Sequence, residues 1–251
     1  MGASLISEEV ISKRITFLKM AALFSELGNE DLKVLAKKFH ARNYKRKDII
    51  FHQGDDSHVL YVILKGKVRI FSVSPAGNET SYRIFSMYDV IGEFAVIDGR
   101  PRSTTAQAIE SSTLLEIKQE QFLRCIYEMP DLAMRLIKLL VEKLRFTTAY
   151  AESMVQYDTT GRLLNMLLQY NEIHGVELES GKRYELDIFM QQEDIATMVG
   201  ARREWVNRIL KEWNKQGLIE YKHGKITILD LSEFEKERDR RIGFLKDKDG
   251  W

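Results

Sequence analysis

Cysteine is almost missing from this chain of 251 residues, which contains only Cys125. A single cysteine excludes disulfides within the chain, and it excludes the clustered thiolates that bind iron–sulfur clusters or structural zinc. The thiol lies among apolar neighbours, so we expect it to be buried and unreactive. The five histidines are scattered, and we expect His52 and His58, which share one loop region, to be solvated rather than metal ligands. The sequence therefore predicts no metal site and no haem.

An excess of charge is also missing, because 38 basic and 37 acidic residues leave a net charge of +1. No global field indicates a nucleic-acid or membrane partner, so any such signal must be local. No window approaches the run of about 18 apolar residues that a membrane span needs, and no secretory leader is visible. We therefore expect a cytoplasmic protein without a membrane partner.

The chain also lacks the side-chain sets that catalysis requires. We find no nucleophile paired with a base and no metal constellation, so we predict no catalytic residues and no enzymatic activity. An enzyme remains the rival hypothesis from another functional class. A second rival is a protein-docking module that never touches DNA, and a gel shift with a salt titration would separate it from a DNA-binding protein.

Short apolar runs separated by glycine fill the region from Lys47 to Gln119 and are typical of strands. Pro75-Ala76-Gly77-Asn78 is a strong hairpin signal between two of them. Many short strands at near-regular spacing favour an antiparallel barrel or roll. The predicted strands are Ile49–Phe51, Val59–Leu64, Val68–Val73, Tyr82–Phe85 and Leu114–Ile117.

Helical spacing of apolar residues flanks this region on both sides. Residues 5–23 and Asn29–Phe39 are predicted helices before it, and one long helix is predicted from Asp131 to about Tyr157. Asp158 is a fresh N-cap, so we place a domain boundary there. The long helix carries a heptad seam that favours pairing with an identical helix over packing on its own domain. The seam residues are Ala133, Ile137, Leu140, Leu144, Thr147, Ala151 and Met154.

The stretch from Gly92 to Thr104 holds one carboxylate, Glu93, and one guanidinium, Arg102, between glycine turns and a proline. A cyclic nucleotide presents an anionic ring phosphate and a ribose hydroxyl, so its pocket needs a cation beside exposed N–H groups and an acceptor. Arg102 and Glu93 suit these roles. The alternative is a purely structural ion pair, because Gly-Glu and Pro-Arg pairs are common in hairpin loops.

The segment from 192 to 216 is typical of two helices around Gly200. Val206, Ile209, Leu210 and Trp213 share one predicted buried face. The opposite face carries side chains that can reach base edges, and a hairpin with a basic tip follows at 217–227. Residues 200–225 contain seven basic and three acidic residues. Together these features predict a winged helix-turn-helix with a local basic patch, although a lone charged helix face would favour a merely solvated surface.

The order of these motifs resembles the superfamily of the cyclic-AMP receptor protein and the fumarate-nitrate regulator over about residues 24–230. Thirteen consecutive positions from Gly92 resemble its phosphate-binding cassette, and 195–211 resemble its DNA-binding element. The cyclic-AMP receptor branch is favoured, since Thr147 and Thr148 match the adjacent hydroxyl residues that grip the base there. The oxygen-sensing branch needs clustered cysteines, which are absent.

The resemblance implies two sets of site residues. The implied ligand-binding residues are Gly92, Glu93, Phe94, Arg102, Ser103, Thr104, Thr147 and Thr148. The implied DNA-binding residues are Arg202, Arg203, Glu204, Asn207, Arg208 and Lys211. Two departures limit the second set: Arg202 stands where the family usually has a small hydroxyl cap, and Trp205 replaces a smaller residue. The preferred half-site is therefore expected to differ from the TGTGA-like sequence that the family implies.

We expect an α+β protein whose N-terminal antiparallel β-roll, of jelly-roll type, is followed by a long dimerisation helix and a C-terminal winged helix-turn-helix. The predicted segments are 1–130, 131–157, 158–231 and a charged tail at 232–251, expected to be a short helix followed by disorder. The expected function is a homodimeric transcription regulator of two-fold-symmetric double-stranded DNA, with RNA polymerase as a further partner. It needs no cofactor and is controlled by cyclic AMP or cyclic GMP. The alternative is a regulator of the same fold that is ligand-independent or senses another small molecule.

Overall fold

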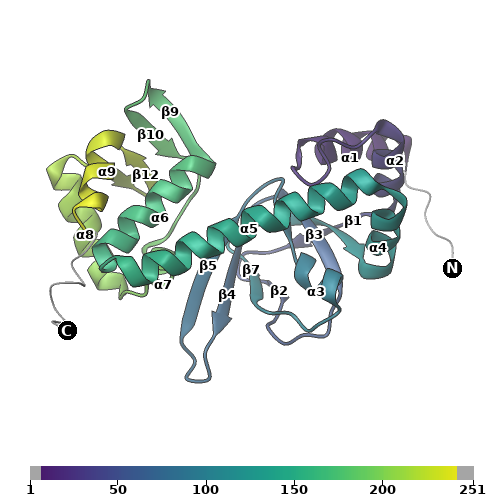
Figure 1. Cartoon of the computed structure of the whole chain (residues 1–251), viewed down its shortest axis with the longest axis horizontal. Helices are drawn as coiled ribbons and strands as arrows, with labels where there is room; N and C mark the ends of the chain where they lie inside the picture. The colour runs from purple at the N-terminus through teal and green to yellow at the C-terminus, as the bar shows by residue number, and fades with distance from the viewer. Residues whose placement is uncertain (1–6, 242–251) are drawn as a thin grey trace. The chain divides into compact units, whose positions relative to one another are not determined.

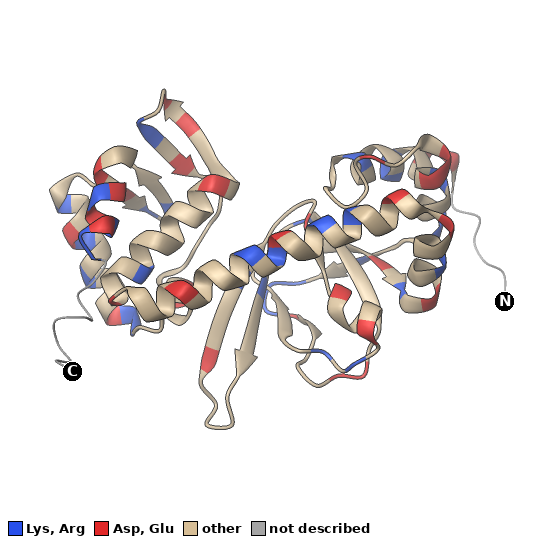
Figure 2. Cartoon of the chain, viewed as in Figure 1, with Lys and Arg blue, Asp and Glu red and all other residues tan. Residues whose placement is uncertain are grey.

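The computed structural model describes residues 7–241 and contains helices and strands in the order shown in Figure 1. The chain forms two compact units, Met1–Lys143 and Leu144–Trp251. One helix, α5 (Pro130–Gln156), contains the point of division. The domain bounds expected from the sequence stay a prediction, and the two units are described separately below. Lys and Arg are interspersed with Asp and Glu over both units (Figure 2), in keeping with the balanced overall charge.

Two four-stranded antiparallel sheets form the N-terminal roll. One has the order β1-β8-β3-β6, and the other has the order β2-β7-β4-β5. Their strands are β1 (His40–Tyr44), β2 (Ile49–Phe51), β3 (Val59–Lys65), β4 (Val68–Val73), β5 (Glu79–Phe85), β6 (Val90–Ile91), β7 (Thr105–Ala108) and β8 (Ser112–Lys118). The predicted antiparallel roll is thus confirmed. The strands β1, β6 and β7 were not predicted, because they are short and carry few consecutive apolar residues.

Four helices complete this unit: α1 (Glu8–Met20), α2 (Asn29–Lys38), α3 (Glu93–Asp98) and α4 (Gln119–Glu128). Apolar side chains of α1, α2, α4 and the first turns of α5 pack with β3 and β8 into one core. Cys125 is fully buried in this core, and burial raises the pKa of its thiol. The expected burial of this cysteine is confirmed. A second, smaller core lies between the two sheets of the roll.

The exposed apolar stripe of α5 shares Ile137, Leu144 and Ala151 with the predicted seam and differs from it at the other positions. Leu140, expected in the seam, packs against the core of the N-terminal unit. The exposed apolar residues of α5 are instead spaced by three and four positions from Met134, and they are Met134, Ile137, Val141, Leu144 and Val155. Thr148 and Ala151 continue this stripe at the same spacing and are exposed. A 3–4 repeat of exposed apolar positions is the pattern of a coiled-coil seam.

The C-terminal unit joins helices to a four-stranded sheet of order β11-β12-β10-β9. Its further elements are α6 (Thr159–His174), β9 (Gly175–Glu179), β10 (Arg183–Leu186), α7 (Gln192–Val199), α8 (Arg203–Gln216), β11 (Ile219–Lys222), β12 (Lys225–Ile228) and α9 (Leu231–Asp239). The predicted N-cap is present, because the Asp158 carboxylate accepts a hydrogen bond from the Gly161 backbone N–H at 2.7 Å. The predicted tail helix corresponds to α9, and the expected disorder beyond residue 241 lies outside the described residues.

The segment from Asn171 to Lys182 forms regular structure for most of its length. Its first residues complete the last turn of α6, and the rest forms a hairpin of β9 and β10. All five residues of β9 are exposed, and acidic residues alternate with apolar ones in it. The pairing with β10, which also pairs with β12, stabilises this strand without a buried face. The wing is the hairpin of β11 and β12. Because β12 also pairs with β10, the wing is part of a larger sheet.

Candidate functional site: a nucleotide cassette and a DNA-reading head

The cassette from Gly92 to Thr104 contains a short helix, α3, between its two glycines. Gly92 (φ 80°) precedes α3, and Gly99 (φ 67°) follows it. Both glycines adopt the left-handed conformation, which side chains with a Cβ disfavour. A Cβ on Gly92 would lie 2.7 Å from Nη1 of Arg102, so glycine is also needed for the close approach of this guanidinium.

The Arg102 side chain is 3% exposed and fills the space behind Gly92. Its Nη1 donates to the Gly92 carbonyl at 2.8 Å, Nη2 to the Val59 carbonyl at 2.7 Å, and Nε to Ser57 Oγ at 3.1 Å. The guanidinium also stacks 4.2 Å from the ring centroid of Phe51. Burial lowers the pKa of Arg102, yet an arginine stays protonated throughout the range in which proteins fold. A fixed positive charge therefore lies inside the roll.

The Glu93 carboxylate is the buried anion of the cassette, and Glu93 is also 3% exposed. Its Oε1 accepts a hydrogen bond from Nζ of Lys143 on α5 at 2.8 Å. The same ammonium donates to the Val90 carbonyl at 2.8 Å and lies 4.9 Å from the ring centroid of Phe85. A buried charge is stable only when it is paired and hydrogen-bonded, and this lysine supplies both interactions.

The other predicted ligand residues have less enclosed positions. Phe94 on α3 is half exposed, Ser103 is exposed, and Thr104 is partly buried. Thr147 and Thr148 lie on the part of α5 that belongs to the C-terminal unit, and the Thr148 hydroxyl donates to the Leu144 carbonyl at 3.0 Å. The structure thus brings Gly92, Glu93 and Arg102 together, whereas the grouping of the two threonines with them stays a prediction.

Sequence reasoning missed several residues around the two cassette charges. Ser57 and Val59 bind Arg102 from 45 and 43 positions away, and Lys143 binds Glu93 from 50 positions away. Nothing local in the sequence marks these residues, because the pairing of β3 and the packing of α5 create their contacts. Only the aromatic content of the neighbouring strands could have indicated the ring wall that Phe51 and Tyr61 form beside Arg102.

The helix-turn-helix formed by α7 and α8 has the buried face that the apolar spacing predicted. Val206, Ile209, Leu210 and Trp213 are buried on one face of α8, and Trp213 packs edge to face against Phe234 of α9. Ile195, Ala196 and Val199 of α7 are buried too, and Gly200 (φ 66°) makes the turn between the helices. The Arg202 side chain makes no capping hydrogen bond to α8, as its departure from a hydroxyl residue implied.

Most of the predicted DNA-binding residues are exposed to solvent. Arg202, Arg203, Glu204, Arg208 and Lys211 are exposed, whereas Trp205 is partly buried. Asn207 is partly buried as well, and its Oδ1 accepts a hydrogen bond from Nε2 of Gln192 at 3.2 Å. The sequence analysis did not single out Gln192, which is the first residue of α7.

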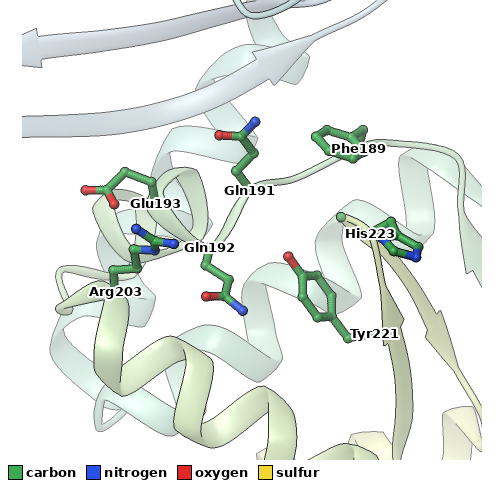
Figure 3. A pocket seen from close by; sticks show the side chains of 8 residues that line it. Phe189, Gln191, Gln192, Glu193, Arg203, Tyr221 and His223 are labelled. Carbon is green, nitrogen blue, oxygen red and sulfur yellow. The ribbon is translucent and has the colours of Figure 1, made fainter.

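A hollow of about 720 Å³ lies beside the start of α8, and Figure 3 shows its lining side chains. Its walls come from the start of α7, from Arg203 and from the wing turn at His223 and Gly224. The Met190 backbone N–H donates to the Gly224 carbonyl at 2.9 Å, and the Phe189 ring occupies the place that a Cβ on Gly224 would take. The wing tip is therefore attached to the segment that leads into α7.

Other kinds of site find no support in the part of the chain that the structure describes. Residues 7–241 contain no group of three or more His, Cys, Asp or Glu residues placed to bind a metal ion. Within the same residues, no helix combines the length and apolar character needed to cross a membrane.

Comparison with known proteins matches a family model to each of the two regions. Residues 41–128 match the family model of the cyclic nucleotide-binding domain, and residues 161–237 match that of the Crp-like helix-turn-helix domain. The cAMP-activated global transcriptional regulator CRP of Salmonella typhimurium is 30% identical over 192 residues, which are 76% of this chain and 89% of that protein.

Two further likenesses extend over more of the chain. The CRP-like cAMP-activated global transcriptional regulator of Mycobacterium tuberculosis is 28% identical over 223 residues, which are 89% of this chain and 98% of that protein. The solved structure of a mutant CooA from Carboxydothermus hydrogenoformans has a TM-score of 0.70 at 21% identity, and the match covers 85% of this chain and 91% of that one. The chain is a transcription regulator with a cyclic nucleotide-binding domain and a helix-turn-helix, not an enzyme, and it belongs to the family of the cyclic-AMP receptor protein and the fumarate-nitrate regulator.

Proposed function

We propose that the protein is a homodimeric regulator controlled by cyclic AMP, which binds a two-fold-symmetric DNA site. The observation that carries the proposal is the buried pair of opposite charges at the cassette: Arg102 and Glu93 are each 3% exposed and flank the backbone of Gly92. Two buried charges are costly to retain for stability alone. They match the phosphate and the ribose hydroxyl of one ligand, and two relatives that match most of this chain carry the name cAMP-activated.

The proposed ligand contacts divide between charge and shape. Arg102 binds the cyclic phosphate with the N–H groups that do not already bind the protein, and Glu93 accepts from the ribose hydroxyl. Gly92, Phe94, Ser103 and Thr104 line the same pocket. Thr147 and Thr148 contact the base, so that a bound ligand contacts α5 beyond Lys143. A coupling of about 1–3 kcal/mol between ligand and DNA would suffice for a useful switch.

The proposed dimer forms through the exposed stripe of α5. Its large apolar side chains follow the coiled-coil repeat, and Leu144 near the centre is 65% exposed in the isolated chain. A second copy of this helix would remove that surface from water and stabilise the pair. The same symmetry would place two copies of α8 in successive major grooves about 34 Å apart. RNA polymerase is the further partner that the proposal includes.

We propose that four residues of α8 contact base edges: Arg203, Glu204, Asn207 and Arg208. Arg202, which precedes α8, and Lys211 contact phosphates. Arg can read guanine bidentately, Glu can accept from the cytosine amine, and Asn can pair with adenine. In the wing, Lys222 and Lys225 contact the phosphate backbone of the DNA in this proposal. Phosphate contacts of this kind make affinity fall steeply with salt.

One observation favours the alternative of a ligand-independent regulator. All three guanidinium nitrogens of Arg102 already bind protein oxygens, and the Glu93 carboxylate is paired with Lys143. The charges of the cassette are therefore satisfied without a nucleotide. A regulator of another small molecule with the same fold is the remaining form of this alternative.

The test is calorimetric titration of the full chain with cyclic AMP and cyclic GMP, followed by gel shifts on a randomised DNA pool with and without each nucleotide. We expect cyclic AMP to bind and to increase DNA affinity. Replacing Arg102 by Ala should weaken nucleotide binding about ten- to hundredfold, since a charge-assisted contact is worth about 1.5–3 kcal/mol. Arg100→Ala, at an exposed position two residues earlier, is the matched control. Unchanged binding by Arg102→Ala would rule out this pocket, and DNA binding without any nucleotide would favour the alternative.

A further inference from the structure

The contact between Gln192 and Asn207 joins the start of α7 to the reading face of α8. Nε2 of Gln192 donates to Oδ1 of Asn207 at 3.2 Å, and both side chains are partly buried. Asn207 lies one helical turn after Arg203 and next to Arg208, so it belongs to the surface that we propose reads DNA. Among the described residues, this is the only side-chain hydrogen bond of Asn207.

The contact matters because a side-chain amide has two different ends. An asparagine reads adenine by accepting from its N6 amine through Oδ1 and donating to N7 through Nδ2. An asparagine that is rotated by half a turn about its last bond presents these groups in the wrong order. In this arrangement the donor from Gln192 uses one lone pair of Oδ1, which leaves the second lone pair and the Nδ2 amine for a base.

The surroundings of Gln192 give this pair room to meet DNA. Gln192 lines the hollow beside α8 together with Arg203 and Tyr221, and Figure 3 shows its side chain extending from the start of α7 into that space. Tyr221 is held in turn, because its hydroxyl donates to the Met190 carbonyl at 3.4 Å. Gln192 therefore faces an open hollow and not an apolar core.

We infer that Gln192 is a positioning residue for sequence recognition, which fixes the amide of Asn207 in the orientation that prefers adenine over guanine at one position of each half-site. This inference rests on the proposed reading of DNA by α8, and it adds a residue of α7 to the determinants of specificity. Guanine presents acceptors at both O6 and N7, so an amide that turns freely discriminates against it less well. Loss of the Gln192 donor should therefore relax the choice between the two purines.

The experiment measures base preference at each half-site position by selection from a randomised DNA pool, using the full chain with cyclic AMP present and absent. Gln192→Met keeps the length of the side chain but has no amide donor. Gln192→Lys keeps a donor, while it removes the amide acceptor and adds a positive charge. Asn207→Ala and the double variant Gln192→Met with Asn207→Ala test whether the two residues act as one unit. Gln216→Met, at the far end of α8 where Gln216 binds Glu212, is the matched control.

We expect Gln192→Met and Asn207→Ala each to lower the preference for adenine over guanine at the same position by about tenfold, the value of one well-placed contact. The double variant should lose no more than either single variant, and Gln192→Lys should retain the preference while binding all DNA more tightly. An unchanged profile for Gln192→Met, or additive losses in the double variant, would overturn the inference. DNA binding by the unaltered protein without any base preference would instead overturn the proposed reading by α8. Melting temperatures of all variants identify any loss that comes from unfolding.

Discussion

Lys143 Nζ lies 2.8 Å from Glu93 Oε1, so a residue near the middle of α5 is paired with the carboxylate that begins the cassette helix. The two residues are separated by 50 positions, and the side chains are 16% and 4% exposed. One turn further along α5 comes Thr147, the first of the two hydroxyl residues that we propose contact the nucleotide base. Any ligand that donates a hydrogen bond to Glu93 must therefore share this carboxylate with Lys143 of α5.

Lys143→Gln should lower the free energy of unfolding of the N-terminal unit by about 2–4 kcal/mol, because it leaves the buried Glu93 carboxylate without its counter-charge. Chemical denaturation followed by fluorescence measures this change. Lys138→Gln is the control, since Lys138 pairs at 3.8 Å with Glu26 and both side chains are more than half exposed. Addition of Glu93→Gln to Lys143→Gln should restore part of the loss, and a double variant as unstable as the single one would contradict the role given to this pair.

Arg102→Lys should weaken both folding and nucleotide binding although it conserves the charge. An ammonium cannot reach the carbonyls of Gly92 and Val59 and the Ser57 hydroxyl in the geometry of the guanidinium fork. We expect unfolding to become easier by about 1–3 kcal/mol, the cost of unsatisfied buried acceptors, with nucleotide affinity reduced at least about tenfold. Thermal melting and calorimetry report the two effects. Arg100→Lys should change neither, and equal behaviour of the two variants would show that charge alone matters at 102.

Residues close together in the sequence account for the parts of the site that could be predicted. Glu93 and Arg102 belong to one short segment, and the inward face of α8 follows directly from the spacing of Val206, Ile209 and Trp213. The roll was predictable for a similar reason, because glycine turns separate its apolar strands. These features follow from local sequence patterns, which form the same structure whatever residues lie further along the chain.

The residues and elements that the sequence did not predict depend on contacts made by the tertiary fold. Lys143 reads as an ordinary solvated lysine on a helix, and only the packing of α5 against the roll brings it to Glu93. The same packing partly buries Leu140, so that Val141 and not Leu140 belongs to the exposed stripe of α5. The strand β9 has no buried residue, so its pairing with β10 leaves no mark in the hydrophobic pattern.

Leu144→Asp should convert the proposed dimer to monomers. Leu144 is 65% exposed on the stripe of α5, and a two-fold pairing would bury it in both copies. Loss of two such side chains and the addition of two carboxylates should weaken association at least about a hundredfold. Sedimentation equilibrium measures the association constant. Tyr127→Asp is the control, because Tyr127 is 85% exposed but lies on α4 away from the stripe. A Leu144→Asp protein that remains dimeric would show that α5 does not form the interface.

Glu193→Gln should strengthen binding to DNA of every sequence. Glu193 lies in the first turn of α7 and lines the hollow beside α8 together with Arg203, where its carboxylate would oppose an approaching phosphate. Removal of one negative charge close to the DNA backbone should raise affinity about three- to tenfold at low salt, and the gain should shrink as salt screens the charges. Fluorescence anisotropy with a cognate duplex and an unrelated duplex over a series of salt concentrations measures both effects.

Glu212→Gln, an exposed change of the same kind near the end of α8, should leave affinity unchanged. A gain confined to one DNA sequence would instead mean that Glu193 contacts a base, and a loss of affinity would mean that the carboxylate accepts a hydrogen bond from the DNA.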